Sequence, residues 1–195
     1  MNFLAHFVLS CNQPLLLVGN FLGDFVKGKQ YQNYPSEIAK GILLHRAIDN
    51  FTDKHPVWLQ SASRLRPFFG RYSPILMDIL GDYLLASLWE NVMSAIPYSD
   101  FVASVYAILR EWLVFFPPKA KFTADYMISE DWLMRYRSIE GTQRSLRGMA
   151  ERLRVSLPFE SATDILISYQ VEYEQEFLMF WKEIQKFVVH FLKDY

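Results

Sequence analysis

Apolar residues recur at spacings of three and four through almost the whole chain, and this periodicity restricts the fold more than any other feature of the sequence. Alternating apolar and polar stretches of strand length are scarce, and the residue pairs typical of tight hairpin turns are absent. We therefore expect an all-α fold with about seven to nine helices. The helical pattern covers residues 2–11, 15–27, 36–53, 73–93, 98–116, 122–137, 141–154 and 163–193.

Proline and serine mark several of the expected helix ends. We expect Ser36 to be the N-cap of the third helix, and Pro56 to end it, because the residue before a proline is pushed away from helical angles. Ser73 is the expected N-cap of the next helix, with Pro74 at its first helical position.

The segments between these helices are short, and no repeat or low-complexity tract divides the chain. We therefore expect residues 1–195 to form a single domain. A domain of this length buries roughly 70% of the surface that its unfolded chain exposes. The composition, 51% hydrophobic and 21% charged, suits a large core with a solvated exterior.

Charge and cysteine content limit the partners and the compartment. The net charge of -1 provides no general attraction to nucleic acid or to a membrane, so we expect neither as a partner. The single cysteine, Cys11, excludes an internal disulfide and fits a reducing compartment. The apolar N-terminal stretch has no early Lys or Arg and is interrupted by His6, Asn20 and Asp24, which is unlike a signal peptide. We expect a cytoplasmic protein.

Histidines and aspartates form pairs with a spacing of four on the apolar helices, so the members of each pair share one helix face. Buried aspartates are costly unless they are paired or bind a metal. We therefore predict that several helices direct these groups to a divalent-metal site in the interior. Imidazole and carboxylate ligands suit Mn²⁺, Fe²⁺, Mg²⁺ or Zn²⁺, and such an ion would lower the pKa of a bound water that attacks phosphorus. The pairs are Asn20–Asp24, His45–Asp49 and Asp78–Asp82, and Asp53 follows Asp49 by one turn.

Each of these residues also has an ordinary structural interpretation. His6 suits a satisfied core histidine, and Asp53 suits the end of a helix or a turn. Asp78 and Asp82 suit a solvated helix edge. The combination favours the metal site, because chance would have to place acidic residues on three separate apolar helices.

Arginines are concentrated in residues 131–154, which hold six arginines against three acidic residues. The guanidinium group binds oxyanions through two parallel hydrogen bonds, so this segment suits phosphates or an acidic partner. An ordinary solvated helix face is the alternative. The arginines are Arg135, Arg137, Arg144, Arg147, Arg152 and Arg154.

Several motifs of the chain resemble those of the acyl carrier protein phosphodiesterases, also called acyl carrier protein hydrolases. The resemblance covers nearly the whole chain in the same order, through MNFLAH, GNFLGDFVKG, GILLHRAIDNFTDKHP, PILMDILGDYLL, EDWLMRYRSIEG and RGMAERL. It implies a divergent, all-helical branch of the HD phosphohydrolases that depends on a divalent metal, usually Mn²⁺. It also implies hydrolysis of the phosphodiester between 4'-phosphopantetheine and a serine of holo-acyl carrier protein.

The resemblance also implies a set of site residues. The chain lacks an adjacent His-Asp dyad, because Arg46 follows His45. Asp24, His45 and Asp49 are implied to be catalytic, and Arg46 is implied to bind the phosphate, with a salt bridge to Asp49 or Asp53 as the alternative. Asp53 and His55 are implied to support the ligands or transfer protons. The implied metal ligands are His6, Asp24, His45, Asp49 and Asp82, with Asp78 as a competitor to Asp82.

Acyl carrier protein, the implied substrate, is small and very acidic, so the arginines would bind it. Its docking site would consist of Arg135, Arg137, Arg144 and Arg147. Two other functions stay open at this point. One is an HD-like phosphohydrolase of a nucleotide or another small phosphodiester, and the other is a helical module that binds acyl carrier protein without chemistry.

Overall fold

The computed structural model describes residues 1–194, and all the regular secondary structure in this range is helical. This confirms the all-α prediction. Nine of the described α-helices have seven or more residues; four shorter ones bring the total above the expected range. The α-helices are α1 (Phe3–Val8), α2 (Pro14–Leu22), α3 (Ser36–Thr52), α4 (Pro56–Ser63), α5 (Arg66–Phe69), α6 (Ser73–Ser87), α7 (Trp89–Val92), α8 (Tyr98–Trp112), α9 (Pro118–Ser129), α10 (Trp132–Arg135), α11 (Ile139–Leu153), α12 (Ala162–Ser168) and α13 (Gln170–Asp194). The 3₁₀ helices are η1 (Gly28–Asn33), η2 (Gly70–Tyr72), η3 (Leu113–Phe115) and η4 (Phe159–Ser161).

The two predicted serine caps are wrong, because both helices begin earlier than expected. The carbonyl of Pro35 already accepts the helical hydrogen bond from Ala39 N–H at 2.8 Å, so Ser36 lies inside the first turn of α3 and its hydroxyl caps nothing. The hydroxyl of Ser73 donates instead to the carbonyl of Gly70 at 2.8 Å, which continues the preceding 3₁₀ turn into α6.

Several expected helices are divided in the structure. As predicted, α3 ends before Pro56, but this proline also begins α4, a helix that the sequence analysis missed. Proline favours the first position of a helix because its missing N–H has no partner there anyway. The expected helix 122–137 is divided between α9 and α10 by Asp131, whose φ of 48° is left-handed. The expected helices 73–93 and 163–193 are each divided into two.

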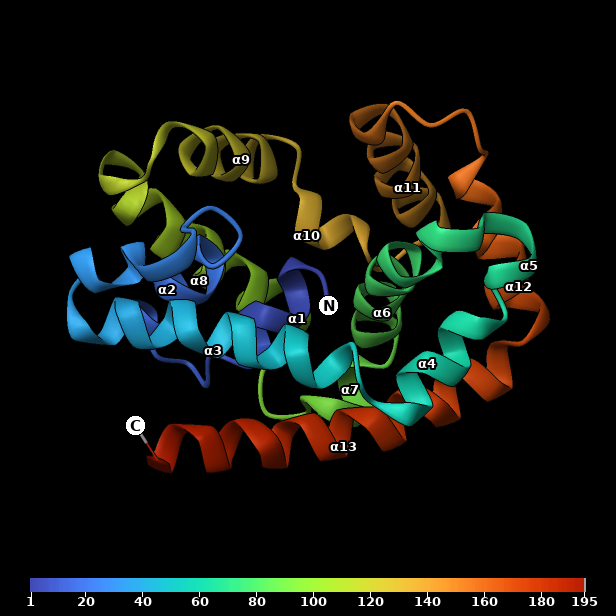
Figure 1. Ribbon diagram of the computed structural model, residues 1–195, viewed down its shortest axis with the longest axis horizontal. Helices are drawn as coiled ribbons and strands as arrows, with labels where there is room; N and C mark the ends of the chain where they lie inside the picture. Colours follow the sequence, from blue (N-terminus) through green and yellow to red (C-terminus); the bar gives the residue numbers. More distant parts are fainter. Residues whose placement is uncertain (195) are drawn as a thin grey trace.

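The N-terminus lies near the centre of the molecule, between α3, α6 and α10, while α13 runs along one side (Figure 1). The short helix α1 contacts both α2 and α6, and α13 contacts α3, α4 and α6. These contacts between elements far apart in the sequence support our proposal that the chain forms a single domain. Within residues 1–194, no helix has the length and apolar character that crossing a membrane requires.

Helices α2 and α3 are in direct backbone contact at a pair of glycines. A Cβ atom added to Gly19 would lie 2.1 Å from the carbonyl oxygen of Ile38, and one added to Gly41 would lie 2.3 Å from that of Leu16. Only glycine allows this approach. Gly41 lies one turn before His45, so this contact sets the position of that histidine relative to α2.

We predict that Gly41→Ala lowers the free energy of unfolding by about 1–3 kcal/mol, because the added methyl group forces α2 away from α3. Urea unfolding followed by circular dichroism measures this. Gly148→Ala is the matched control: it lies in α11 with no atom within 4 Å of the added Cβ, and it should be neutral or stabilising by up to about 1 kcal/mol. Equal stability of Gly41→Ala and wild type would contradict the backbone contact.

Candidate active site

His6 lies on α1, a helix of six residues that is too short to be stable alone. The buried carboxylate of Asp82 in α6 accepts hydrogen bonds from the first turn of this helix, from Leu4 N–H at 2.8 Å and Ala5 N–H at 3.2 Å. These N–H groups have no partner within a helix, and the helix dipole favours a negative charge beside them. Burial raises the pKa of Asp82 to about 7, against the opposing effect of these two hydrogen bonds.

The resemblance implied that Asp82 is a metal ligand, and the structure places its carboxylate against the first turn of α1. Its two oxygens face the backbone of α1, and the group that could hold a metal does not include it. The competitor, Asp78, lies 3.3 Å from the N-terminal ammonium of Met1 and also stands outside that group. Asp82 thus holds the helix that carries the candidate ligand His6.

Asn20 of α2 orients the imidazole of His6. Its Oδ1 accepts a hydrogen bond from Nδ1 of His6 at 2.8 Å, and its Nδ2 donates to the carbonyl of His6 at 2.8 Å and to Oγ of Ser10 at 3.1 Å. This places the proton of the neutral ring on Nδ1 and leaves the lone pair on Nε2. Such a contact on the far nitrogen is what fixes a metal-binding histidine. The spacing of Asn20 and Asp24 in the sequence did not indicate this role of Asn20.

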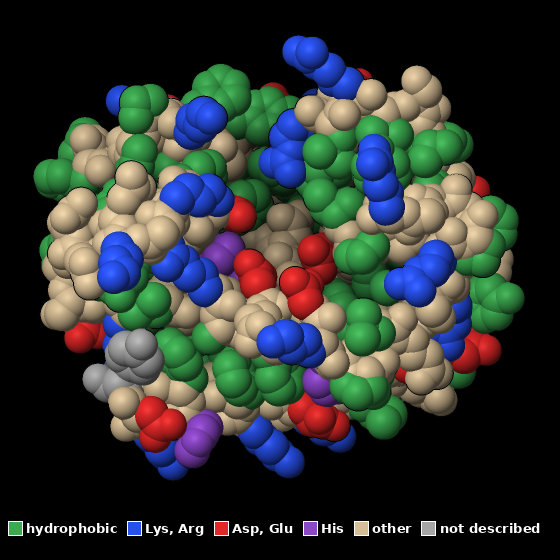
Figure 2. All heavy atoms as spheres, in the orientation of Figure 1, with side chains coloured by type: hydrophobic (Ala, Val, Ile, Leu, Met, Phe, Trp, Pro, Cys, Tyr) green, Lys and Arg blue, Asp and Glu red, His purple; other side chains and the backbone are tan. Residues whose placement is uncertain are grey.

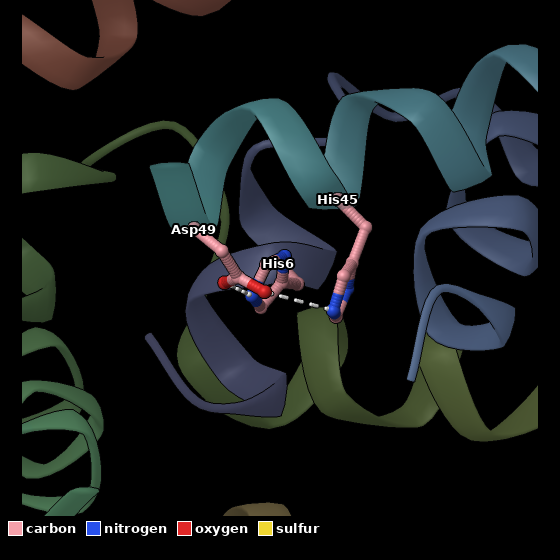
Figure 3. Close-up of side chains that lie close together, drawn as sticks. All are labelled: His6, His45 and Asp49. Carbon is pink, nitrogen blue, oxygen red and sulfur yellow. Dashed lines mark ion pairs between the residues drawn. The ribbon is translucent and has the colours of Figure 1, made fainter. Parts of the chain in front are cut away.

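His45 of α3 brings the second imidazole to the same point. Its Nε2 lies 3.2 Å from Oδ2 of Asp49, one turn further along α3, and 3.7 Å from Oδ1 of Asp24. The rings of His6 and His45 are stacked with 4.1 Å between their centroids (Figure 3). Gly23 leaves room for this ring, because a Cβ there would lie 2.2 Å from Cγ of His45.

The two histidines differ in their pKa. Burial, together with the positive charge of the neighbouring His45, lowers the pKa of His6 to about 4. Burial acts on His45 in the same direction, but hydrogen bonds to Asp24 and Asp49 outweigh it and raise the pKa of His45 to about 9. Burial alone would raise the pKa of Asp49, yet the interaction with His45 holds it well below its usual range.

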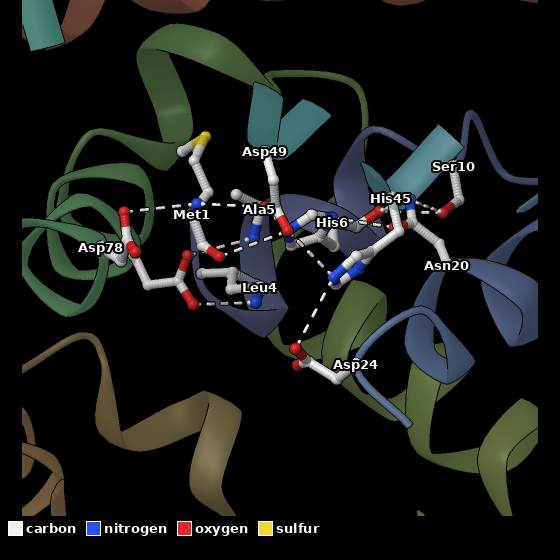
Figure 4. A network of polar contacts seen from close by, with 11 residues as sticks. Met1, Leu4, Ala5, His6, Ser10, Asn20, Asp24, His45, Asp49 and Asp78 are labelled. Atoms are coloured by element: carbon white, nitrogen blue, oxygen red, sulfur yellow. Dashed lines mark hydrogen bonds and ion pairs between the residues drawn. The ribbon is translucent and has the colours of Figure 1, made fainter. Parts of the chain in front are cut away.

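The cluster of His6, His45 and Asp49 fits a divalent cation. One ligand atom from each residue lies within 4.8 Å of the other two, and ions such as Zn²⁺ bind nitrogen and oxygen ligands at about 2.0–2.2 Å. Nε2 of neutral His6 and Oδ1 of Asp49 face each other at 3.2 Å as two acceptors, an arrangement that a cation between them makes favourable. Figure 4 shows the cluster within a continuous polar network that runs from Asp78 through Met1 to Asn20.

The cluster opens into a cleft of about 1110 Å³. Acidic residues and His45 gather on the side formed by α3, α6 and the end of α2, whereas α9, α10 and α11 provide basic residues. Figure 2 shows the hollow, with acidic and histidine side chains at its floor and Lys and Arg side chains around it. The acidic residues that line the cleft on the first side are Asp24, Asp49, Asp53 and Asp78. The charged residues on the second side are Lys119, Arg135, Arg144, Arg152 and Glu151.

The structure places Arg46, which the resemblance implied to bind the phosphate, against the loop that follows α2. Its guanidinium group donates to the carbonyls of Gly28 and Val26, both at 2.8 Å, and lies over the ring of Tyr31. Successive residues of a helix point about 100° apart, so the position after His45 faces away from the cluster. Arg46 instead holds the loop that follows α2.

His55 and Asp53 also lie apart from the cluster. Nε2 of His55 lies 3.0 Å from a carboxylate oxygen of Glu183 on α13, and its ring packs edge-on against Phe180. Its implied role beside the metal stays a prediction. Asp53 is the C-cap residue of α3, as the structural interpretation of this residue predicted. It is exposed and lines the cleft.

The four arginines proposed to bind a partner are divided between two positions. Arg135 and Arg144 line the cleft, and both form salt bridges with Glu130, at 2.7 and 2.9 Å. Arg137 instead forms a salt bridge with Glu90 at 2.8 Å and is absent from the cleft lining. Arg147 is exposed on α11. The basic segment therefore contributes both to the cleft and to the surface around it.

Fold and site together define a class: an all-helical protein with a histidine–carboxylate centre in an open cleft, the donor set of a metal-dependent hydrolase. The model of the acyl carrier protein phosphodiesterase family matches residues 1–184. The chain belongs to this family, which confirms the resemblance in its sequence motifs.

Individual relatives agree with the family match. The acyl carrier protein phosphodiesterases of Enterobacter sp. (strain 638) and of Salmonella paratyphi A (strain ATCC 9150 / SARB42) are each 38% identical to this chain over 152 residues. That of Salmonella newport (strain SL254) is 37% identical over the same length. Each match covers 78% of this chain and 79% of the relative. No solved structure matches the chain.

We predict that the two stacked histidines of the metal-free protein titrate far apart, His45 near pH 9 and His6 near pH 4. The folded pKa of His45 lies above its unfolded value of about 6.5, so its ion pairs stabilise the fold fully below about pH 6.5 and are lost as the pH rises through 9. The lowered pKa of His6 has the opposite effect, and stability decreases as the pH falls from about 6.5 toward 4.

Nuclear magnetic resonance of the histidine ring protons, followed from about pH 3 to 10, spans the expected pKa values of both histidines and tests this prediction. The chain has four histidines, so the variants His6→Gln and His45→Gln assign the signals, since each removes one titration curve. Titration of both rings together near about pH 6.5 would show that neither is perturbed and would contradict the described contacts.

Proposed function

We propose that this protein hydrolyses the phosphodiester that links 4'-phosphopantetheine to a serine of holo-acyl carrier protein. Water adds to phosphorus, the bond to the serine oxygen breaks, and the serine hydroxyl recovers a proton. The products are apo-acyl carrier protein and 4'-phosphopantetheine. The observation that carries the proposal is the cluster of His6, His45 and Asp49 at a cleft, in a chain whose relatives are named acyl carrier protein phosphodiesterases.

His6, His45 and Asp49 are the proposed holders of a divalent ion, with Mn²⁺ favoured by the resemblance and Mg²⁺, Fe²⁺ or Zn²⁺ sharing the same ligand chemistry. Such an ion, when bound, supplies a water of lowered pKa and a positive charge for the phosphoryl oxygens. Asp24 is exposed to the cleft beside His45, so it is placed to bind the ion or to accept a proton from the attacking water.

Arg135 and Arg144 replace Arg46 as the proposed phosphate-binding cations. Both line the cleft on the side opposite to the acidic residues, whereas Arg46 is engaged by backbone carbonyls. Glu130 bridges the two guanidinium groups and so holds them beside each other. Positive charge there stabilises the charge that develops on phosphoryl oxygens in the transition state.

We predict that Asp49→Ala abolishes metal-dependent release of phosphopantetheine while the fold is retained, because a ligand and a charge of the site are lost together. The assay incubates metal-stripped protein with holo-acyl carrier protein, with and without Mn²⁺, and follows the intact mass of the carrier protein. His190→Gln is the matched control. Its side chain is 79% exposed near the C-terminus, and the variant should keep full activity.

The mass assays of the wild type and of Asp49→Ala distinguish the candidate functions. An unchanged carrier-protein mass with folded, metal-loaded wild type would exclude the proposed activity. Cleavage of small phosphodiesters alone would then favour a phosphohydrolase of small substrates, and binding without cleavage would favour a helical binding module. Full activity of Asp49→Ala would exclude the proposed ligand set.

We also predict that Arg147→Glu lowers kcat/KM for holo-acyl carrier protein several-fold and leaves kcat unchanged. The exposed Arg147 lies outside the cleft lining, so its charge acts mainly on the encounter with an acidic substrate. The loss should shrink as salt is raised, since salt screens exposed charges. Lys182→Glu, an exposed change of equal charge on α13, is the control. Activity that is constant from low to high salt would contradict electrostatic docking.

A further inference from the structure

Helix α9 has apolar residues on its solvent-facing side. Phe122 is 73% exposed and Tyr126 is 47% exposed, and they lie one turn apart on the same face. The opposite face is buried through Ala120, Ala124 and Met127. Two large aromatic side chains exposed together on one helix face are typical of a contact surface.

This aromatic pair forms a ridge between two hollows. Phe122 and Tyr126 line the cleft on one side, and on the other side they line a shallower groove of about 610 Å³ together with Arg110 and Leu113. Figure 1 shows α9 and α11 on opposite sides of the region above the N-terminus. A macromolecule whose reactive bond reaches the cluster must cover the rim of the cleft, and this ridge is part of that rim.

The charges around the ridge are mainly positive and favour an acidic partner. Lys119 and Lys121 are exposed on the same helix, and Lys119 also lines the cleft. Asp125 is the exposed acidic residue of this helix, and it lines the groove on the other side together with Arg110. Arg144 faces the cleft from α11. Positive charge beside exposed aromatic side chains suits a protein surface that combines carboxylates with apolar residues.

The other end of the cleft has a different character. Ile75 and Ile79 of α6 and Met149 of α11 line it, and Ile79 is only 1% exposed. The charged residues that border these apolar side chains are Asp78, Glu151 and Arg152. Recessed apolar side chains of this kind suit a slender, uncharged ligand chain and not a protein surface. The pantetheine arm has this chemistry, because it is a slender, uncharged chain of methyl and methylene groups, amides, a hydroxyl and a thiol.

We propose that α9 is the docking surface for the carrier protein, with Phe122 and Tyr126 as its apolar contacts and Lys119 as its charged contact. The pantetheine arm then extends from the cluster toward Ile75 and Met149. This inference rests on the proposed function and adds the orientation of the substrate in the cleft. It assigns a role to a helix that lies outside the arginine-rich segment.

The test measures binding of labelled apo-acyl carrier protein, the product that lacks the arm, by fluorescence anisotropy. The double variant Phe122→Ala/Tyr126→Ala should raise Kd about tenfold or more, because exposed aromatic anchors contribute most of the energy of such contacts. Phe68→Ala is the matched control: this side chain is 64% exposed and lies outside the cleft lining, so Kd should stay within about twofold of wild type.

A second variant tests the position of the arm. Met149→Trp narrows the far end of the cleft, so it should raise KM for holo-acyl carrier protein and leave Kd for the apo form unchanged. Unchanged Kd in the double variant, or an equal rise in the Phe68 control, would overturn the docking surface. Cleavage of holo-acyl carrier protein by wild type is measured in parallel. Absence of cleavage by the wild type would overturn the proposed function. Normal cleavage by the wild type, together with an unchanged Kd in the double variant, would overturn only the docking surface.

Discussion

The candidate site depends on the buried hydrogen bonds between the carboxylate of Asp82 and the first turn of α1. A six-residue helix has too few internal hydrogen bonds to hold its own position. The carboxylate satisfies N–H groups that would otherwise be buried without a partner, and Asn20 holds His6 from the opposite side. Asp82 and Asn20 thus fix the direction of one imidazole, and neither belongs to the group of His6, His45 and Asp49 that could hold a metal.

The concentration of negative charge is the second constraint. Asp24, Asp49, Asp53 and Asp78 all line one side of the cleft. His45 and the N-terminal ammonium are the positive groups that contact these residues in the described part of the chain. Carboxylates so close together favour the binding of a divalent cation. The same charges repel an anionic substrate unless such a cation and the basic residues of α9, α10 and α11 compensate them.

The helical periodicity was sufficient to predict the fold class and most helix positions, because apolar residues that recur with a period of 3.6 form a buried face only in an α-helix. The spacing of His45 and Asp49 likewise predicted their shared face, since both lie on one continuous helix. The position of His6 beside them depends on contacts between helices, which a local pattern does not contain. Asp78 and Asp82 share a spacing and a composition, and only the packing of α1 against α6 distinguishes their roles. The implied role of Arg46 rested on its adjacency to His45 in the sequence, whereas adjacent residues of a helix point in different directions.

The exposure of α9 shows why surface function is harder to predict than core structure. Its sequence, PKAKFTADYMIS, has apolar residues on two faces, and the usual expectation is that the larger ones are buried. The structure buries Ala120 and Ala124 and exposes Phe122 and Tyr126. Small residues on the inner face let α9 pack closely on α8, which leaves no space there for aromatic rings. Tyr126 packs edge-on against Trp132 of α10, but neither aromatic residue belongs to the inner contact with α8. A partner at the rim of the cleft gives a physical reason for their exposure.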